Sequence, residues 1–210
     1  MDTNELIKAL AADSQKLMPL SRAWWSAAGL AVVLSAAIVF ATLTPRPDIA
    51  IAAETPRFLF KIIFAVTLAA SAFGVVRALS RPGAEWRMAM PYLAAAPALL
   101  ATAVIVELLL QPDAWAVGMM GANGPACLFA LLLVGLGPLA VILAALRHGA
   151  PASPAIAGAV AGLLAGGIAA IFYAAHCPDD SPLFVALWYT LAIAALTILG
   201  ATVAHRLIRW

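Results

Sequence analysis

The 210-residue chain is 65% hydrophobic, and only 10% of its residues carry a charge. A soluble domain normally has roughly 25% charged residues, so this composition excludes an ordinary water-soluble fold and favours a chain that faces lipid. The net charge of +2 is too small to favour nucleic-acid binding.

The chain begins with a polar segment, residues 1–23, ahead of the first long apolar run. Within it, Leu6, Ile7 and Leu10 fall near one stripe, which predicts a short amphipathic helix over Asn4–Leu17. Such a helix either anchors the chain on the membrane surface or docks into a groove of a cytoplasmic partner. In the second case, we expect these three apolar residues to bind the partner.

Six apolar segments follow, each long enough to cross a bilayer, which takes about 20 residues as a helix. They are Trp24–Leu43, Phe58–Leu79, Ala89–Leu110, Pro125–Leu146, Pro154–Ala175 and Leu183–Ala204. Pro and polar residues punctuate the connections, where Pro ends a helix by removing a backbone donor. The predicted fold is all-α, a polytopic membrane protein built as a six-transmembrane-helix bundle. Its parts are the cytoplasmic segment 1–23, the transmembrane domain 24–204 and a cytoplasmic tail, 205–210.

The distribution of Lys and Arg predicts the orientation, because these residues are retained on the cytoplasmic side. Nine of them fall on the side of the two termini: Lys8, Lys16, Arg22, Arg77, Arg81, Arg87, Arg147, Arg206 and Arg209. Three fall on the opposite side: Arg46, Arg57 and Lys61. We therefore expect both termini in the cytoplasm and, in a bacterium, a multi-pass inner-membrane protein whose other face meets the periplasm.

The chain has two cysteines, and this topology places both at the periplasmic face. Cys127 opens the fourth span, and Cys177 follows the fifth. Three interpretations stay open: a plain disulfide between two loops, a pair that responds to an oxidant or a soft metal ion, and two unconnected thiols. His176, Asp179 and Asp180 lie beside Cys177 and offer further metal-ligand atoms, although the spacing is not that of a stereotyped zinc site.

Two charged residues lie inside predicted spans, Lys61 and Glu107, each near the periplasmic end. An intramembrane charge suggests function by default, but at this depth we expect both side chains to reach interfacial water. The fifth span carries Gly158, Gly162 and Gly166 at every fourth position. This spacing brings two helix backbones close together, and we expect it to serve packing within the chain.

No catalytic signature is present: the sequence has no phosphate loop, no His-Glu-x-x-His and no Gly-x-Ser-x-Gly. We therefore predict that the protein is not an enzyme and has no resident cofactor. A small transporter or metal exporter is the alternative from another class. In that alternative, Glu107, Pro97 and Pro138 would line a path, because broken helices and intramembrane charges form such paths.

Two stretches give the chain a family resemblance: the opening, Asp2–Asp13, and the loop His176–Pro182 that runs into Leu183–Tyr189. On these residues the whole chain resembles the six-span NrsF-type anti-sigma factors of proteobacteria. Members of that family restrain an extracytoplasmic-function (ECF) sigma factor of the SigF type.

The resemblance implies a division of labour between the two faces of the membrane. Cys127 and Cys177 would sense oxidative or heavy-metal stress, and the only ligand implied is a heavy-metal ion held transiently by these two thiols. The N-terminal segment and the cytoplasmic loops would hold the sigma factor and release it on stress.

Overall fold

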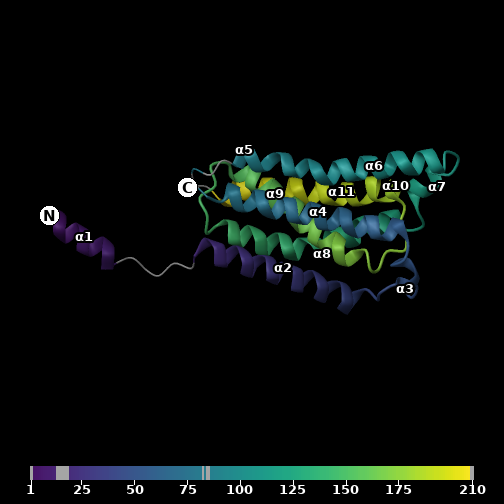
Figure 1. The fold of residues 1–210 in the computed structure, drawn as a ribbon. Coiled ribbons are helices and arrows are strands. Elements are labelled where there is room, and N and C mark those ends of the chain that lie inside the picture. Colours follow the sequence, from purple (N-terminus) through teal and green to yellow (C-terminus); the bar gives the residue numbers. More distant parts are fainter. Residues whose placement is uncertain (1, 13–18, 82, 84–85, 209–210) are drawn as a thin grey trace.

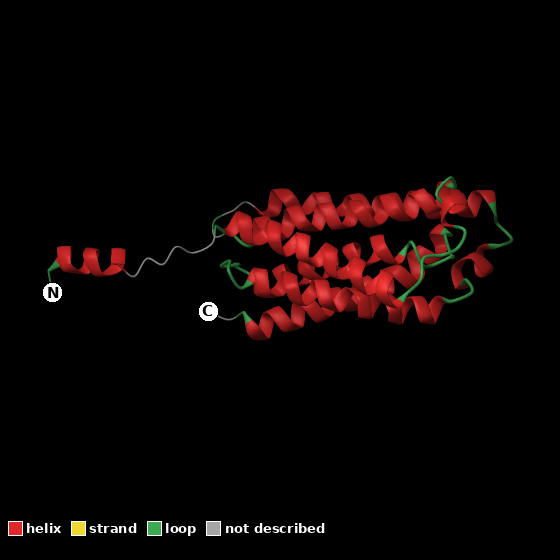
Figure 2. Ribbon diagram, turned by 90° about the horizontal axis from the view of Figure 1, so that it is seen from below, coloured by secondary structure: helices red, strands yellow, loops and turns green. Residues whose placement is uncertain are grey.

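The computed structural model describes residues 2–12, 19–81, 83 and 86–208, and every regular element among them is helical (Figures 1 and 2). In chain order the elements are α1 (Thr3–Ala12), α2 (Leu20–Thr42), α3 (Ile49–Ala52), α4 (Pro56–Leu79), α5 (Trp86–Ala89), the 3₁₀ turn η1 (Met90–Ala94), α6 (Ala95–Leu110), α7 (Trp115–Met120), α8 (Gly124–Leu146), α9 (Pro154–Tyr173), α10 (Pro182–Phe184), the π-helical turn η2 (Val185–Tyr189) and α11 (Thr190–Leu207).

Six of the helical stretches are long and apolar enough to cross a membrane, as the sequence predicts. They run side by side as one bundle, with the short helices α3, α7 and α10 at one end (Figure 1). The largest shift from a predicted boundary is at the start of the fourth span, and the first span, which begins at Leu20, and the third also begin earlier than predicted. The third begins at Trp86 because α5 and η1 precede α6, and the fourth begins at Trp115 because α7 precedes α8.

The predicted amphipathic helix is present as α1, which covers Thr3–Ala12. The rest of the predicted range, residues 13–17, lies outside the described residues. The amide of Glu5 donates to the carbonyl of Asp2 at 3.0 Å, which closes the first turn of the helix. The start of α2 and the C-terminal end of the chain lie at the opposite end of the bundle from α3 and α7 (Figure 1).

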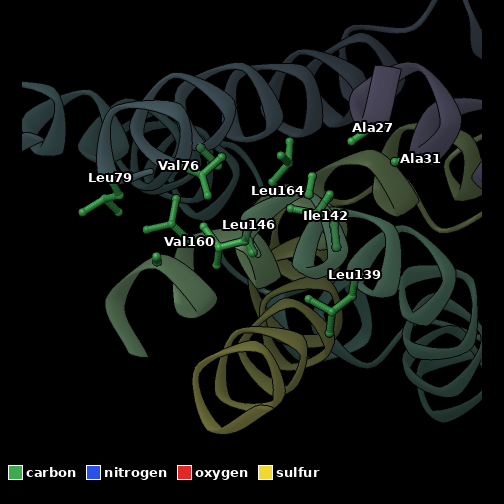
Figure 3. Close-up of a cluster of buried hydrophobic side chains, with 14 of the residues drawn as sticks. Ala27, Ala31, Val76, Leu79, Leu139, Ile142, Leu146, Val160 and Leu164 are labelled. Carbon is green, nitrogen blue, oxygen red and sulfur yellow. The ribbon is translucent and has the colours of Figure 1, made fainter. Parts of the chain in front are cut away.

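The core is built around α9, which is the most buried span and packs against α11, α4 and α8. Figure 3 shows side chains of the main cluster pointing toward one another from four helices. The labelled members are Ala27 and Ala31 of α2, Val76 and Leu79 of α4, Leu139, Ile142 and Leu146 of α8, and Val160 and Leu164 of α9. Removing one such side chain leaves a cavity, because a packed interior relaxes only partly.

The glycine repeat of the fifth span lies in the contact between α9 and α11. Gly158 faces Gly200 and Ala204, Gly162 faces the backbone of Leu196, and Gly166 faces Ile193. The prediction that these glycines serve packing within the chain is confirmed. The two helices approach so closely that a methyl group at either of the first two positions would overlap backbone atoms of α11.

We expect Gly162→Ala to destabilise the bundle, by about 2–3 kcal/mol, as overpacking of a tight contact does. The new methyl carbon would lie 2.5 Å from the Cα atom of Thr197, and backbone cannot yield as a side-chain end can. Gly29→Ala is the matched control, since a methyl group there meets nothing within 4 Å. Thermal unfolding in detergent measures both, and equal melting temperatures for the two variants would contradict the expectation.

Candidate functional site

The two cysteines meet at the end of the bundle that carries α3, α7 and α10. Cys127 lies in the first turn of α8, and Cys177 lies in the loop after α9. Their Sγ atoms are 3.2 Å apart, both residues are buried, and no bond joins them. The Cys127 amide donates to the Asn123 carbonyl and the Cys177 amide to the Tyr173 carbonyl, so two helix ends fix the pair.

The loop that carries Cys177 is fastened to the connection between α2 and α3. Nδ1 of His176 lies 2.7 Å from the Thr44 carbonyl oxygen, to which it can only donate. The backbone amide of Arg46 donates to the carbonyl of Ala175 at 3.0 Å. The predicted ligand His176 thus has one ring nitrogen engaged with the backbone.

Lys61 of α4 is fully buried, and its ammonium group reaches the same loop. Its Nζ atom donates to the carbonyl oxygens of Cys177 and Asp179, both at 3.0 Å, and to Oδ1 of Asp180 at 2.8 Å. The expectation that Lys61 extends to interfacial water is wrong, because the loop folds over the ammonium group and supplies all of its acceptors.

Arg46 approaches Asp180 from the other side of the loop. Its Nη1 atom lies 2.6 Å from Oδ2 of Asp180 and 3.4 Å from the Cys177 carbonyl oxygen. The opposite edge of the guanidinium group binds both carboxylate oxygens of Asp48, at 2.8 and 2.7 Å. This hydrogen bonding raises the pKa of Arg46 above its usual value and lowers the pKa of Asp48. The pair therefore stays charged at neutral pH.

Asp179 connects the loop to the start of α8. Its two carboxylate oxygens accept from the backbone amides of Ala122 and Asn123, at 3.2 and 3.4 Å. Gly121 precedes them with a φ of +60°, and a methyl group there would lie 2.9 Å from the Asp179 carboxyl carbon. Glycine permits both the left-handed backbone and the close approach.

The two thiols and Asp179 form a group that fits a metal ion. Both sulfur atoms and one carboxylate oxygen lie within 4.8 Å of one another. Thiolates select soft metal ions, and metal–sulfur bonds of about 2.3 Å would allow one ion to touch all three donors. Of the predicted neighbours, Asp179 belongs to this group. Asp180 is engaged by Lys61 and Arg46 instead.

Two tyrosine rings share a buried cluster with the thiol pair. Tyr173 of α9 and Tyr189 of η2 belong to the same buried cluster as both cysteines, with ring centroids 6.1 Å apart. The Lys61 ammonium group lies 5.6 Å from the centroid of the Tyr189 ring. Tyr189 Oη is buried and has no hydrogen-bond partner within the described part of the chain. A π-helical turn often marks a functional position.

The environment favours the thiolate form of Cys177. A hydrogen bond from the Cys127 thiol lowers the pKa of Cys177 to about 7; the Lys61 charge acts in the same direction, and burial opposes both. The thiolate is the form that attacks oxidants and binds metal ions. The sequence contains no local signal for this effect, because the partners come from separate helices.

The ionisation of Cys177 is expected to follow pH near neutrality. A lowered pKa means that the thiolate forms as pH rises through about 7, whereas an ordinary thiol ionises near 8.5. Thiolate ultraviolet absorbance of the reduced protein, minus that of Cys177→Ser, measures the midpoint. A midpoint above about 8.5 would contradict the structure.

Glu107, the second charged residue predicted inside a span, also has an ion-pair partner. Glu107 of α6 is only 8% exposed, and its Oε1 atom lies 2.8 Å from Nη2 of Arg57 on α4. The expectation that Glu107 reaches interfacial water is therefore wrong: an ion pair between two helices engages it. This pair lies in a groove between α4 and α6.

The predicted partner-binding residues lie on α1, away from the thiol pair. Ile7 is 58% exposed. The side chains of Leu6 and Leu10 lie outside the described residues, although the backbone of both is helical.

The fold and site together define a class of protein: a bundle of six membrane-competent helices with a buried thiol pair at one end. Comparison with known proteins identifies the family. The family described as negative regulator of sigma F, NrsF, matches residues 10–210, and the chain belongs to this family.

Two relatives match along their whole length. The anti-sigma-F factor NrsF of Caulobacter vibrioides is 36% identical, and the probable anti-sigma-F factor NrsF of Azospira oryzae is 30% identical; each alignment covers 100% of both chains. No solved structure matches the chain. Membership confirms the family predicted from the two sequence stretches and favours a regulatory, non-enzymatic role.

Proposed function

We propose that the protein is a membrane-bound anti-sigma factor that retains an ECF sigma factor of the SigF type and releases it under oxidative or heavy-metal stress. Family membership supports the regulatory part of this proposal. The observation that carries the sensing part is the distance of 3.2 Å between the Sγ atoms of Cys127 and Cys177. Two free thiols this close can react as one unit.

The charge distribution supports an orientation with the sigma factor inside and the thiols outside. Nine of the 12 Lys and Arg residues belong to the side of the termini. The other three, Arg46, Arg57 and Lys61, lie at the end of the bundle where the thiols meet. In a bacterial inner membrane this arrangement would expose the thiol end to the periplasm, where disulfides are stable.

Two chemical inputs fit the pair. An oxidant of the disulfide or peroxide class would accept two electrons while both thiols lose their protons and one S–S bond forms. A soft divalent ion would displace the same two protons and bind both sulfur atoms, with Asp179 supplying an oxygen ligand. A disulfide would bring the sulfur atoms from 3.2 Å to about 2.05 Å and so draw α8 toward the loop.

The signal would travel through the bundle, because the thiols and the cytoplasmic face are joined by α8 and α4. The connection after α8 is tied to the end of α4, where the amide of Ala150 donates to the Ser80 carbonyl at 3.3 Å. Oxidation or metal binding can shift the equilibrium between two arrangements of the helices only by the difference in free energy with which it stabilises each of them. A disulfide contributes about 2–4 kcal/mol of stabilisation, and a difference of this size would shift an evenly populated equilibrium strongly toward one arrangement.

Co-purification tests the proposal. The detergent-solubilised, reduced chain should retain a SigF-type sigma factor encoded by the same bacterium, and recovery of the chain without it would count against the proposal. The transporter alternative needs Glu107, whereas retention of a sigma factor does not. If the chain is an anti-sigma factor, Glu107→Gln should therefore leave retention of the sigma factor unchanged. A loss of metal-ion flux in this variant, together with absent sigma-factor binding, would favour the transporter instead.

A further inference from the structure

We propose that Lys61 is a positioning residue that holds the loop of Cys177 against α4, so that the Cys177 thiol stays in register with Cys127. The biological role of this contact rests on the proposed function, but its effect on the two thiols can be measured on the purified chain alone. We define the Lys61 latch as the set Lys61, Asp180 and Arg46.

The loop saturates the ammonium group of Lys61 with hydrogen-bond acceptors. An ammonium group has three N–H donors, and those of Lys61 reach the Cys177 carbonyl, the Asp179 carbonyl and the Asp180 carboxylate. All three acceptors belong to one loop of four residues. One of them is the carbonyl of the residue whose thiol faces Cys127, so Lys61 fixes the backbone from which that thiol projects.

Burial makes the contacts of Lys61 costly to break. Lys61 has no exposed surface, and it lies in a helix apolar enough to span a membrane. A buried charge that loses its partners is strongly disfavoured. The loop therefore cannot leave Lys61 gradually, because the first broken bonds would leave the ammonium group poorly paired in an apolar surrounding.

A second cation, Arg46, binds the same carboxylate as Lys61. Asp180 offers one carboxylate oxygen to Lys61 at 2.8 Å and the other to Arg46 at 2.6 Å. The loop is therefore held from both sides, by α4 and by the connection between α2 and α3. Removing Lys61 leaves Asp180 paired with Arg46. Arg46 is itself held in place by Asp48.

The latch has a measurable consequence for the thiols. Holding two thiols in register raises their effective concentration and favours the disulfide. The positive charge of Lys61 acts oppositely, since a stabilised thiolate favours the reduced state. The two effects have opposite signs, so a fall in the disulfide equilibrium constant on loss of Lys61 reports the loss of positioning.

The experiment equilibrates the full-length chain in detergent with dithiothreitol redox buffers at pH 6 and measures the disulfide fraction. Lys61→Met keeps the length of the side chain and removes the donors. We expect its disulfide equilibrium constant to fall about tenfold, which corresponds to a potential about 30 mV less negative. Arg57→Met is the matched control, four residues earlier on α4 and paired with Glu107; it should change the constant less than about twofold.

A second variant guards against misfolding. Asp180→Asn preserves the shape of the loop and weakens both arms of the latch, and we expect a fall of about threefold. Size-exclusion profiles and melting curves identify variants that remain folded. Equilibrium constants within about twofold of the unchanged chain for both variants would overturn the proposal. If Lys61→Met does not fold, Asp180→Asn alone decides.

The outcomes separate the latch from the proposed function. A disulfide equilibrium that depends on Lys61, in a chain that binds no sigma factor, supports the latch and refutes the function. Binding and stress-dependent release of a sigma factor, with an equilibrium indifferent to Lys61, refutes the latch alone.

Discussion

Replacing Cys127 and Cys177 together by Ser is expected to abolish stress-induced release of the sigma factor while leaving its retention intact. Ser is close to Cys in size, so the buried cluster around the pair should still pack. A hydroxyl group forms no disulfide and binds soft metal ions poorly. Expression from a SigF-dependent promoter should therefore stay at its unstressed level after treatment with an oxidant or a cadmium salt.

Each single replacement should be as severe as the double one, because a bridge or a shared ion needs both sulfur atoms. Ser181→Ala is the matched control: its Oγ atom lies in the same loop and accepts a hydrogen bond from the Leu183 amide. We expect this variant to respond normally. Full induction in the double Ser variant would show that the thiols are not the sensor.

The second large effect is expected from the N-terminal helix. Ile7 projects an apolar side chain that is 58% exposed on α1, and an exposed apolar residue on a short amphipathic helix suits docking into a groove of a partner. Ile7→Asp places a charge in that contact. An interface residue of this kind is worth about 2 kcal/mol or more, so we expect affinity for the sigma factor to fall about 30-fold or further.

Binding of labelled sigma factor to the detergent-solubilised chain measures this loss. Lys8→Gln is the matched control, since it changes the neighbouring exposed residue and leaves the apolar stripe untouched. Deletion of residues 2–12 should remove binding altogether. Undiminished binding after this deletion would move the contact to the loops at 80–88 and 147–153, which we propose face the cytoplasm.

The sequence alone predicts the architecture well for a physical reason. A bilayer accepts only segments that satisfy their own backbone and cover their length with apolar side chains, so six apolar runs translate into six spans. The same topology brings the cysteines to one end of the bundle, although 50 residues separate them in the chain. The glycine spacing on α9 predicts a close helix contact equally directly, because glycines at every fourth position fall on one face of the helix.

The charged parts of the site could not be predicted in this way. Lys61 and the carbonyl of Cys177 are 116 positions apart, and only the path of the loop decides whether the ammonium group meets water or the loop. A lysine near the end of an apolar run equally fits an ammonium group in interfacial water, which is what the sequence led us to expect. Arg57 and Glu107, 50 positions apart, illustrate the same limit. The α7 helix was missed because its glycine and polar neighbours resemble a loop.

The most direct measurement is the affinity of the purified chain for its sigma factor with the two thiols free and with them joined. We predict tight binding in the reduced state and a loss of about 5–150-fold when the disulfide forms, the usual range of coupling between distant sites. The double Ser variant should bind equally under both conditions. Equal affinity of the unchanged chain in its reduced and disulfide states would contradict the account.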